Sequence, residues 1–174
     1  MSKWHPNIYD GDDLVRFTLG YTGKNVIFVL CINPSKADDK ISDKTSLQVQ
    51  NISKNYRFDG WIILNLYPLR VTLPSNLPYI RDNELHSQNI SKIRKILENY
   101  NNPIIWAAWG DIILARDYLA ECLKDIYQIT KNHHPTWKCA GTTKKYNPKH
   151  PSRLSNNAPL ENFDIEDYLK NSVK

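Results

Sequence analysis

Two carboxamides and one imidazole are the side chains of this sequence that could act on a polar ligand: Asn33, Asn65 and His150. Asn65 lies within an apolar run, where its amide needs up to about four hydrogen-bond partners, so it either ties down a loop or reads a ligand. Asn33 opens an Asn-Pro-Ser turn and His150 precedes a proline, so both also have a purely structural explanation as turn residues. Brought together, the three would offer a heterocyclic ligand both donors and acceptors.

Positive charge gathers around His150. Residues 131–153 contain six basic residues and no acidic one, whereas the whole chain of 174 residues has a formal net charge of +5. A local positive potential attracts phosphate groups, and this predicts a nucleic acid or a nucleotide as the partner. A solvated basic loop without a partner is the alternative. The residues that we expect to contact phosphate are Lys144, Lys145, Lys149 and Arg153.

Other classes of site are disfavoured. Cys31, Cys122 and Cys139 form no CxxC pair, and no Cys or His stands at zinc-finger spacing, so we expect neither a disulfide framework nor a metal. The apolar runs are much shorter than the roughly 20 residues of a membrane helix, and residues 1–6 have no apolar signal-peptide core. We therefore expect a cytoplasmic protein that has no membrane partner and uses no cofactor.

Short apolar runs alternating with segments of helical period must position these side chains. The runs predict four buried strands and the periodic segments predict helices. The strands are expected at 25–32, 61–66, 103–109 and 135–140, and the helices at 45–56, 83–100, 112–123 and 163–171.

This alternation predicts an α/β fold. We expect a single domain over residues 1–174: a three-layer α/β/α sandwich with a central, mainly parallel four-stranded sheet and an N-terminal edge hairpin around Val15 to Thr18. In such sheets the ligand lies outside the carboxyl ends of the strands. Asn33, Asn65 and the loop that contains His150 all follow or end predicted strands, so they should meet at that edge.

In chain order, four motifs resemble those of the uracil-DNA glycosylase superfamily. That superfamily has G-Q-D-P-Y-H or G-I-N-P-G, then L-L-L-N, then L-W-G, then H-P-S-P-L-S. The corresponding segments here are C-I-N-P-S at 31–35, I-I-L-N at 62–65, A-W-G at 108–110 and H-P-S-R-L-S at 150–155. The resemblance implies the same sandwich fold and cleavage of the bond between a base and its sugar.

A second resemblance covers about residues 14–154. The chain is similar to a bacterial, archaeal and phage family described as a domain of unknown function, with N-P-S-x-A-D, D-x-T, D-N, A-A-W-G and G-x-T-K-x-G-x-P-x-H-P in order. These motifs correspond to residues 33–38, 43–45, 82–83, 107–110 and 141–151. Tyr146 departs from the pattern, which has Gly there, and this change is expected to stiffen or reshape the loop.

The glycosylase resemblance assigns roles to individual residues. His150 would donate a hydrogen bond to a carbonyl oxygen of the departing base, Asn65 would read the base edge, and Asn33 would hold the attacking water. Pro34 and Ser35 would border the base, and Ser35 replaces an aromatic that excludes thymine in strict uracil enzymes. Leu154 would fill the gap left by a flipped nucleotide.

Asn33 stands where several of these enzymes have aspartate. A carboxamide can orient water but cannot act as a base, so turnover should be slow or the leaving group a good one. Asp38 or Asp39 is the candidate for an additional catalytic acid, with a solvated surface charge as the alternative.

Two functions follow from the sequence, beside a structural alternative in which the motifs only brace loops. The first is a uracil-DNA-glycosylase-like N-glycosidase that releases a pyrimidine, modified or not, from nucleic acid or a nucleotide. The second is a module that binds nucleic acid or a nucleotide without chemistry, such as a phage or defence accessory protein. Asn33 in place of an acid favours the second, and the joint presence of Asn65 and His150 favours the first.

Overall fold

The protein folds around one mixed seven-stranded sheet. The computed structural model describes residues 4–171, and the strand order is β1-β2-β4-β3-β5-β6-β7. The strands are β1 (Ile8–Gly11), β2 (Arg16–Tyr21), β3 (Val26–Cys31), β4 (Gly60–Asn65), β5 (Ile104–Ala107), β6 (Thr136–Cys139) and β7 (Glu161–Asn162). The α/β class expected from the sequence is confirmed.

The four strands expected from the apolar runs are β3, β4, β5 and β6. They lie side by side in parallel pairs, so their carboxyl ends meet at one edge of the sheet. The prediction of a four-stranded sheet is wrong, because antiparallel strands extend it on both sides. The expected hairpin forms β1 and β2 on one side, and the two-residue strand β7 pairs with β6 on the other.

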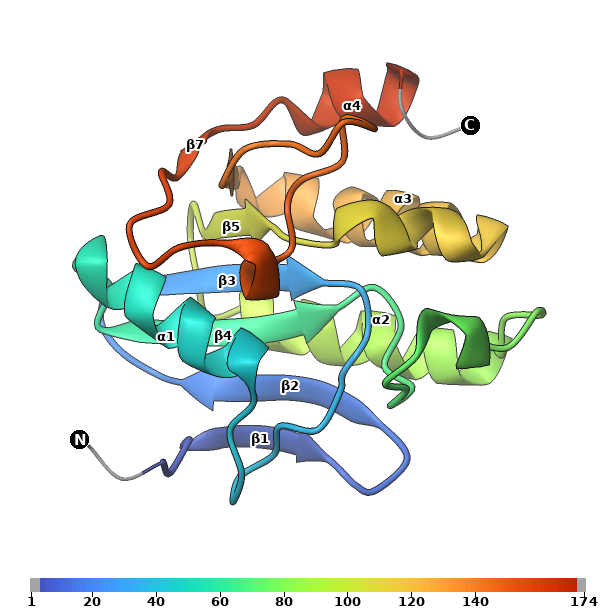
Figure 1. Ribbon diagram of the computed structural model, residues 1–174, viewed down its shortest axis with the longest axis horizontal. Coiled ribbons are helices and arrows are strands. Elements are labelled where there is room, and N and C mark those ends of the chain that lie inside the picture. Colours follow the sequence, from blue (N-terminus) through green and yellow to red (C-terminus); the bar gives the residue numbers. More distant parts are fainter. Residues whose placement is uncertain (1–3, 172–174) are drawn as a thin grey trace.

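Helices cover both faces of the sheet (Figure 1). Helix α1 (Lys44–Asn55) packs on one face over Ile27, Val29 and Ile63. The other face holds a larger core that includes Phe28, Leu30, Ile62 and Leu64. Helices α2 (Asn83–Leu97), α3 (Asp117–Thr130) and α4 (Ile165–Asn171) contribute to that second core. The alternation of side chains along each strand explains the division, since neighbouring residues face opposite sides.

The helix predicted at 112–123 is interrupted. Residues Gly110–Ala115 form a 3₁₀ turn, η2, and Arg116 is extended, with φ −150° and ψ 136°, before α3 begins. The Arg116 guanidinium donates to the carbonyl oxygens of Ser75 and Leu77, which are distant in sequence. Helical periodicity cannot reveal such long-range bonds, so the prediction placed one helix across the break.

The start of α1 is fixed by a capping box. The Asp43 carboxylate accepts a hydrogen bond from the Ser46 backbone N–H at 2.8 Å, and the Ser46 hydroxyl bonds the Asp43 N–H at 2.9 Å. Two N–H groups of the first turn and its N-cap are thereby satisfied. The cap places the N-terminus of α1 beside the carboxyl end of β3.

Within residues 4–171, no helix combines the length and the apolar character that crossing a bilayer requires.

Candidate functional site

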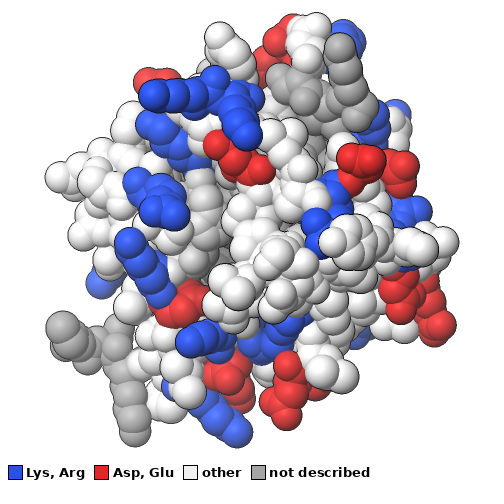
Figure 2. Space-filling view, turned by 45° about the vertical axis from the view of Figure 1, so that its right-hand side comes forward, with Lys and Arg blue, Asp and Glu red and all other residues white. Residues whose placement is uncertain are grey.

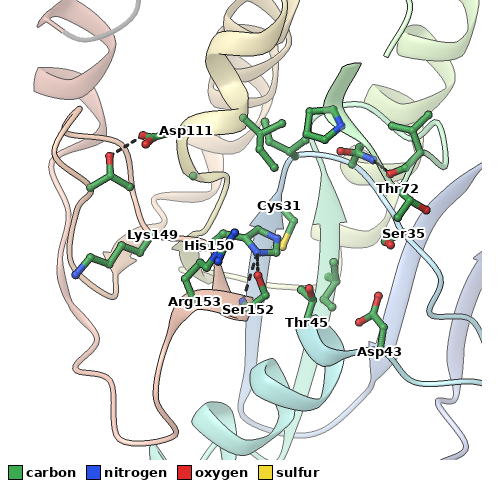
Figure 3. Close-up of a pocket in the computed structure, with 18 of the residues that line it drawn as sticks. Cys31, Ser35, Asp43, Thr45, Thr72, Asp111, Lys149, His150, Ser152 and Arg153 are labelled. Atoms are coloured by element: carbon green, nitrogen blue, oxygen red, sulfur yellow. Dashed lines mark hydrogen bonds between the residues drawn. The ribbon is translucent and has the colours of Figure 1, made fainter. Parts of the chain in front are cut away.

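A cleft of about 650 Å³ lies at the carboxyl end of β3, between the sheet and the N-terminus of α1. Its walls come from β2, the end of β3 and the segment after it, the start of α1, β4 and the segment after it, the turn η2 after β5 and the loop after β6 (Figure 3). The lining residues used below are Arg16, Cys31, Asn33, Ser35, Asp43, Thr45, Ile63, Gly110, Asp111, Thr143, Lys149, His150, Ser152 and Arg153. The position outside the strand ends is the one that the sequence predicts.

His150 is a neutral hydrogen-bond donor in this cleft. Burial lowers the pKa of its imidazole from 6.5 to about 4, so the ring carries no charge at neutral pH. Its Nδ1 accepts a hydrogen bond from the Ser152 backbone N–H at 3.3 Å and lies 2.9 Å from the Ser152 hydroxyl (Figure 3). Because Nδ1 accepts, the single ring proton must reside on Nε2.

Asn33 is held so that its oxygen remains available. The Nδ2 group donates to the carbonyl oxygens of Pro34 at 2.9 Å and Val71 at 2.8 Å. Both amide hydrogens are therefore used by the protein, and Oδ1 is the atom that can accept from a ligand or water. The bonds to Pro34 and Val71 fix which end of this carboxamide serves the cleft.

A chain of hydrogen bonds supports the wall beside His150. Trp109 Nε1 donates to Tyr168 Oη, which donates to Asn147 Oδ1, whose Nδ2 donates to Asp111. The Thr143 hydroxyl also donates to Asp111, at 2.6 Å. We call Trp109, Asp111, Thr143, Asn147 and Tyr168 the bracing network. The bonds from Thr143 and Asn147 hold the pKa of Asp111 below its ordinary value.

Gly110 allows the His150 segment to approach η2. It adopts φ +64°, and an added Cβ would lie 3.2 Å from the Cβ of His150. Its N–H donates to the Pro148 carbonyl oxygen at 2.8 Å. A side chain at this position would strain the backbone and press on the imidazole.

Arg16, Cys31 and Asp43 are among the cleft residues to which the sequence assigned no role. Arg16 and Cys31 are 4% and 2% exposed, and together with Ile63 they form what we call the buried end of the cleft. Burial raises the pKa of the Cys31 thiol to about 12, so it stays protonated. Asp43 and Thr45 belong to the D-x-T motif, and that motif could have identified them as cleft residues. Arg16 is a single arginine in an edge hairpin, and no motif marks it.

Asn65 does not line the cleft. Its side chain is fully buried, and Nδ2 donates to the backbone carbonyl oxygen of Arg16 at 3.0 Å, which ties β4 to β2. Of the two explanations open in the sequence, the structure agrees with the one in which this amide ties down a neighbouring segment.

Two more predicted residues lie away from the cleft lining. Pro34 is buried, and Leu154 is half-buried against the core on the α1 side of the sheet. A side chain packed in this way is not a free wedge, so the structure gives no support to the role of Leu154 as a gap filler. Ser35 does line the cleft, as expected.

The predicted basic and acidic residues divide between the cleft and the open surface. Lys149 and Arg153 line the cleft, whereas Lys144 and Lys145 are exposed on the loop beside it. In Figure 2, Lys and Arg side chains gather along the left-hand side of the face shown. Asp38 and Asp39 lie outside the cleft, and the Asp38 carboxylate accepts from the N–H groups of Lys40 and Ile41.

Tyr146 carries the backbone conformation that its family motif predicts for Gly. Its φ is +63°, in the left-handed region, and its side chain is 74% exposed. The Tyr146 N–H donates to the Thr143 carbonyl oxygen at 3.0 Å, which closes the turn. Tyr146 therefore adopts a turn conformation that favours glycine.

The described residues contain no group of three or more His, Cys, Asp or Glu side chains arranged to hold a metal ion.

Titration of His150 should appear in the stability of the protein. Its folded pKa of about 4 lies below the ordinary 6.5, so between these pH values the unfolded chain binds more protons. The free energy of unfolding should therefore fall as pH drops from about 6.5 towards 4. Urea unfolding of the wild type and of His150→Leu measures this, and the difference between the two curves should change only in that window. A difference that is constant with pH would contradict a depressed pKa.

Comparison with known proteins places the chain in one family. No curated protein and no solved structure matches it. The matching family model covers residues 16–152, a segment that includes Arg16, Asn33, Asp43 and His150. The chain belongs to the family described as "Protein of unknown function (DUF1643)".

Proposed function

We propose that the protein is an N-glycosidase that releases a pyrimidine base, modified or not, from nucleic acid or a nucleotide. The observation that carries this proposal is His150, a half-buried and neutral imidazole whose proton is on Nε2 at the cleft. When a glycosidic bond breaks, the base leaves with negative charge and the sugar becomes cationic. A fixed N–H donor at the base carbonyl stabilises that charge as it develops.

Asn33 supplies the second half of the chemistry. With both Nδ2 hydrogens engaged, its Oδ1 accepts a hydrogen bond from water and orients it towards the sugar. A carboxamide does not remove the proton, so the reaction depends on a well-stabilised leaving group. Asp43 lines the cleft, whereas Asp38 and Asp39, the acids expected from the sequence, do not.

Base recognition differs from what the glycosylase resemblance implies. Asn65 is buried behind the cleft lining, so we assign it no contact with the base. Ser35 occupies little volume at the cleft wall, and this supports a base with a substituent on C5.

Release of the base tests the proposal. Oligonucleotides and mononucleotides carrying uracil, 5-hydroxymethyluracil or other 5-substituted pyrimidines are incubated with the protein, and free base is measured by chromatography. Release by the wild type that greatly exceeds release by His150→Leu supports the proposal. The absence of release from the whole series would contradict it.

Binding without catalysis is the second candidate, and one observation favours it. Asp43 and Asp111, the carboxylates that line the cleft, already accept hydrogen bonds from Ser46 and from Thr143 with Asn147, respectively. Neither is a free base. Tight binding of a nucleotide or oligonucleotide, with no release of base, would identify this function.

The exposed basic loop should contribute to nucleic-acid binding through salt-sensitive contacts. Replacing Lys144, Lys145 and Lys149 with Gln should reduce the slope of log affinity against log salt by about 0.9 for each lost contact with duplex phosphate. Fluorescence anisotropy with a labelled oligonucleotide measures the slope. The control removes three exposed lysines outside the basic segment 131–153, which are Lys24 before β3, Lys95 on α2 and Lys124 on α3. Equal slopes for the two triple variants would mean that only total charge matters.

A further inference from the structure

Arg16 is a buried cation whose hydrogen-bonding capacity is only partly used. It lies on β2, is 4% exposed and lines the buried end of the cleft. Its Nη1 donates to the Ala37 carbonyl oxygen at 2.7 Å, while Nε is buried without a partner. Burial lowers the pKa of the guanidinium to about 10, so it remains charged at neutral pH.

A second arginine, Arg70, donates a hydrogen bond to the same Ala37 carbonyl oxygen. Arg70 Nη1 donates to the Ala37 oxygen at 3.2 Å and to the Ser35 oxygen at 2.8 Å. Its Nε donates to the Asp12 backbone carbonyl oxygen and its Nη2 to the Tyr9 hydroxyl, so all three nitrogens of Arg70 are held by the protein. The ion pairs found among residues 4–171 include neither Arg16 nor Arg70. Two guanidinium groups held together without a paired acid make the buried end of the cleft attractive to an anion.

Asp43 is the carboxylate that acts on the positive charge of Arg16, but its oxygens also accept hydrogen bonds from backbone N–H groups. It raises the pKa of Arg16 through space without reaching ion-pair distance. Its oxygens accept from the N–H groups of Ser46 at 2.8 Å and Ala37 at 3.3 Å, so its charge is committed to the cap of α1. Lys149 and Arg153 line the same cleft and add positive charge.

The N-terminus of α1 faces the cleft near Arg16. The helix has 12 residues, and its N-cap Asp43 and Thr45 of its first turn both line the cleft, as Figure 3 shows. A helix N-terminus together with a guanidinium group matches the negative charge of a phosphate group. The hydroxyl-bearing residues Ser35 and Thr45 are on the same lining.

We propose that Arg16 and the first turn of α1 form a phosphate subsite, which binds a phosphate group of the substrate while the base lies against His150. The position of the base rests on the proposed N-glycosidase function, whereas the phosphate subsite does not. A mononucleotide and an oligonucleotide both carry this group. The substrate is therefore a phosphorylated compound rather than a free nucleoside.

Binding measurements without turnover test the subsite. Calorimetry compares deoxyuridine, its 5′-monophosphate and a short uracil-containing oligonucleotide. The wild type should bind at least one phosphorylated compound roughly 10- to 100-fold more tightly than the nucleoside, as expected for charged hydrogen bonds. Arg16→Met should abolish that preference, Arg16→Lys should restore part of it, and Arg94→Met, an exposed arginine on α2, should retain it. Whichever compound depends on Arg16 identifies the source of the phosphate.

Stability separates ligand binding from a structural role of Arg16. Because a buried charge without an ion pair is costly, Arg16→Met should melt at the wild-type temperature or above it. Inorganic phosphate at constant ionic strength should raise the melting temperature of the wild type but not that of Arg16→Met. No effect of phosphate on the wild type, an equal effect of chloride, or equal binding of nucleoside and nucleotides would overturn the proposal. These outcomes are independent of base release, so the subsite and the glycosidase activity can fail separately.

Discussion

His150→Leu should lower the rate of base release by about 10²–10³-fold, the usual effect of removing one donor that stabilises a developing oxyanion. Leucine approximates the volume of the imidazole, so the cleft keeps its shape while the Nε2–H is lost. The expectation depends on the position of the ring proton. Because Nδ1 accepts a hydrogen bond from Ser152, the proton is on Nε2 and is available to the base. Single-turnover release of base from the best substrate in the series measures the effect.

The matched control is His5→Leu. His5 is exposed and does not line the cleft, so its replacement should leave the rate within about twofold. The pH profile gives a second readout: because the pKa of His150 is lowered to about 4, no change in rate from its titration should appear between pH 7 and about 5. A rate in His150→Leu within a few fold of the wild type would exclude His150 as the donor to the base.

The second large effect is expected on stability. Trp109→Ala should reduce the free energy of unfolding by about 3–5 kcal/mol, because a fully buried indole is lost. The same change removes the donor to Tyr168, the first bond of the bracing network. Tyr168→Phe separates the two contributions, since it keeps the ring and removes the hydroxyl, and it should cost about 1–3 kcal/mol. Urea unfolding measures both variants.

The bracing network also predicts a functional consequence. Asn147 and Asp111 connect the loop before His150 to α4 and to η2, so loosening them should displace the imidazole. In Tyr168→Phe the rate of base release should therefore fall while most of the protein stays folded. Loss of less than about 1 kcal/mol in Trp109→Ala would mean that this tryptophan is not a central packing element.

Much of the fold could be predicted from local pattern. The runs at 25–32 and 61–66 are rich in β-branched residues and became β3 and β4, because continuous apolar runs suit strands buried on both faces. Strand β7 could not be found this way, since Glu161 and Asn162 are exposed and their pairing with β6 depends on the returning chain. The break at Arg116 was missed for a similar reason, because its bonds to Ser75 and Leu77 are long-range.

The site was predictable where a polar residue directly follows a strand. Asn33 and His150 reach the cleft because the carboxyl ends of the parallel strands and their loops converge there. Asn65 shows the limit of that argument. It is the last residue of β4 and bonds β2, whereas Asn33 lies just beyond the end of β3 and reaches the cleft. Arg16 could not be predicted as a cleft residue from the sequence, because its position there depends on two distant segments, the Ala37 loop and the start of α1.

The protonation state of His150 is the measurement on which this account depends most directly. Nitrogen-15 NMR of the imidazoles, with His150→Leu used for assignment, reports which ring nitrogen carries the proton and how the ring titrates. We expect a hydrogen-bonded, unprotonated Nδ1, a protonated Nε2 and a pKa of about 4. A proton on Nδ1 would contradict the Nε2 donor on which base release depends, and titration near the ordinary 6.5 would contradict the lowered pKa that burial produces.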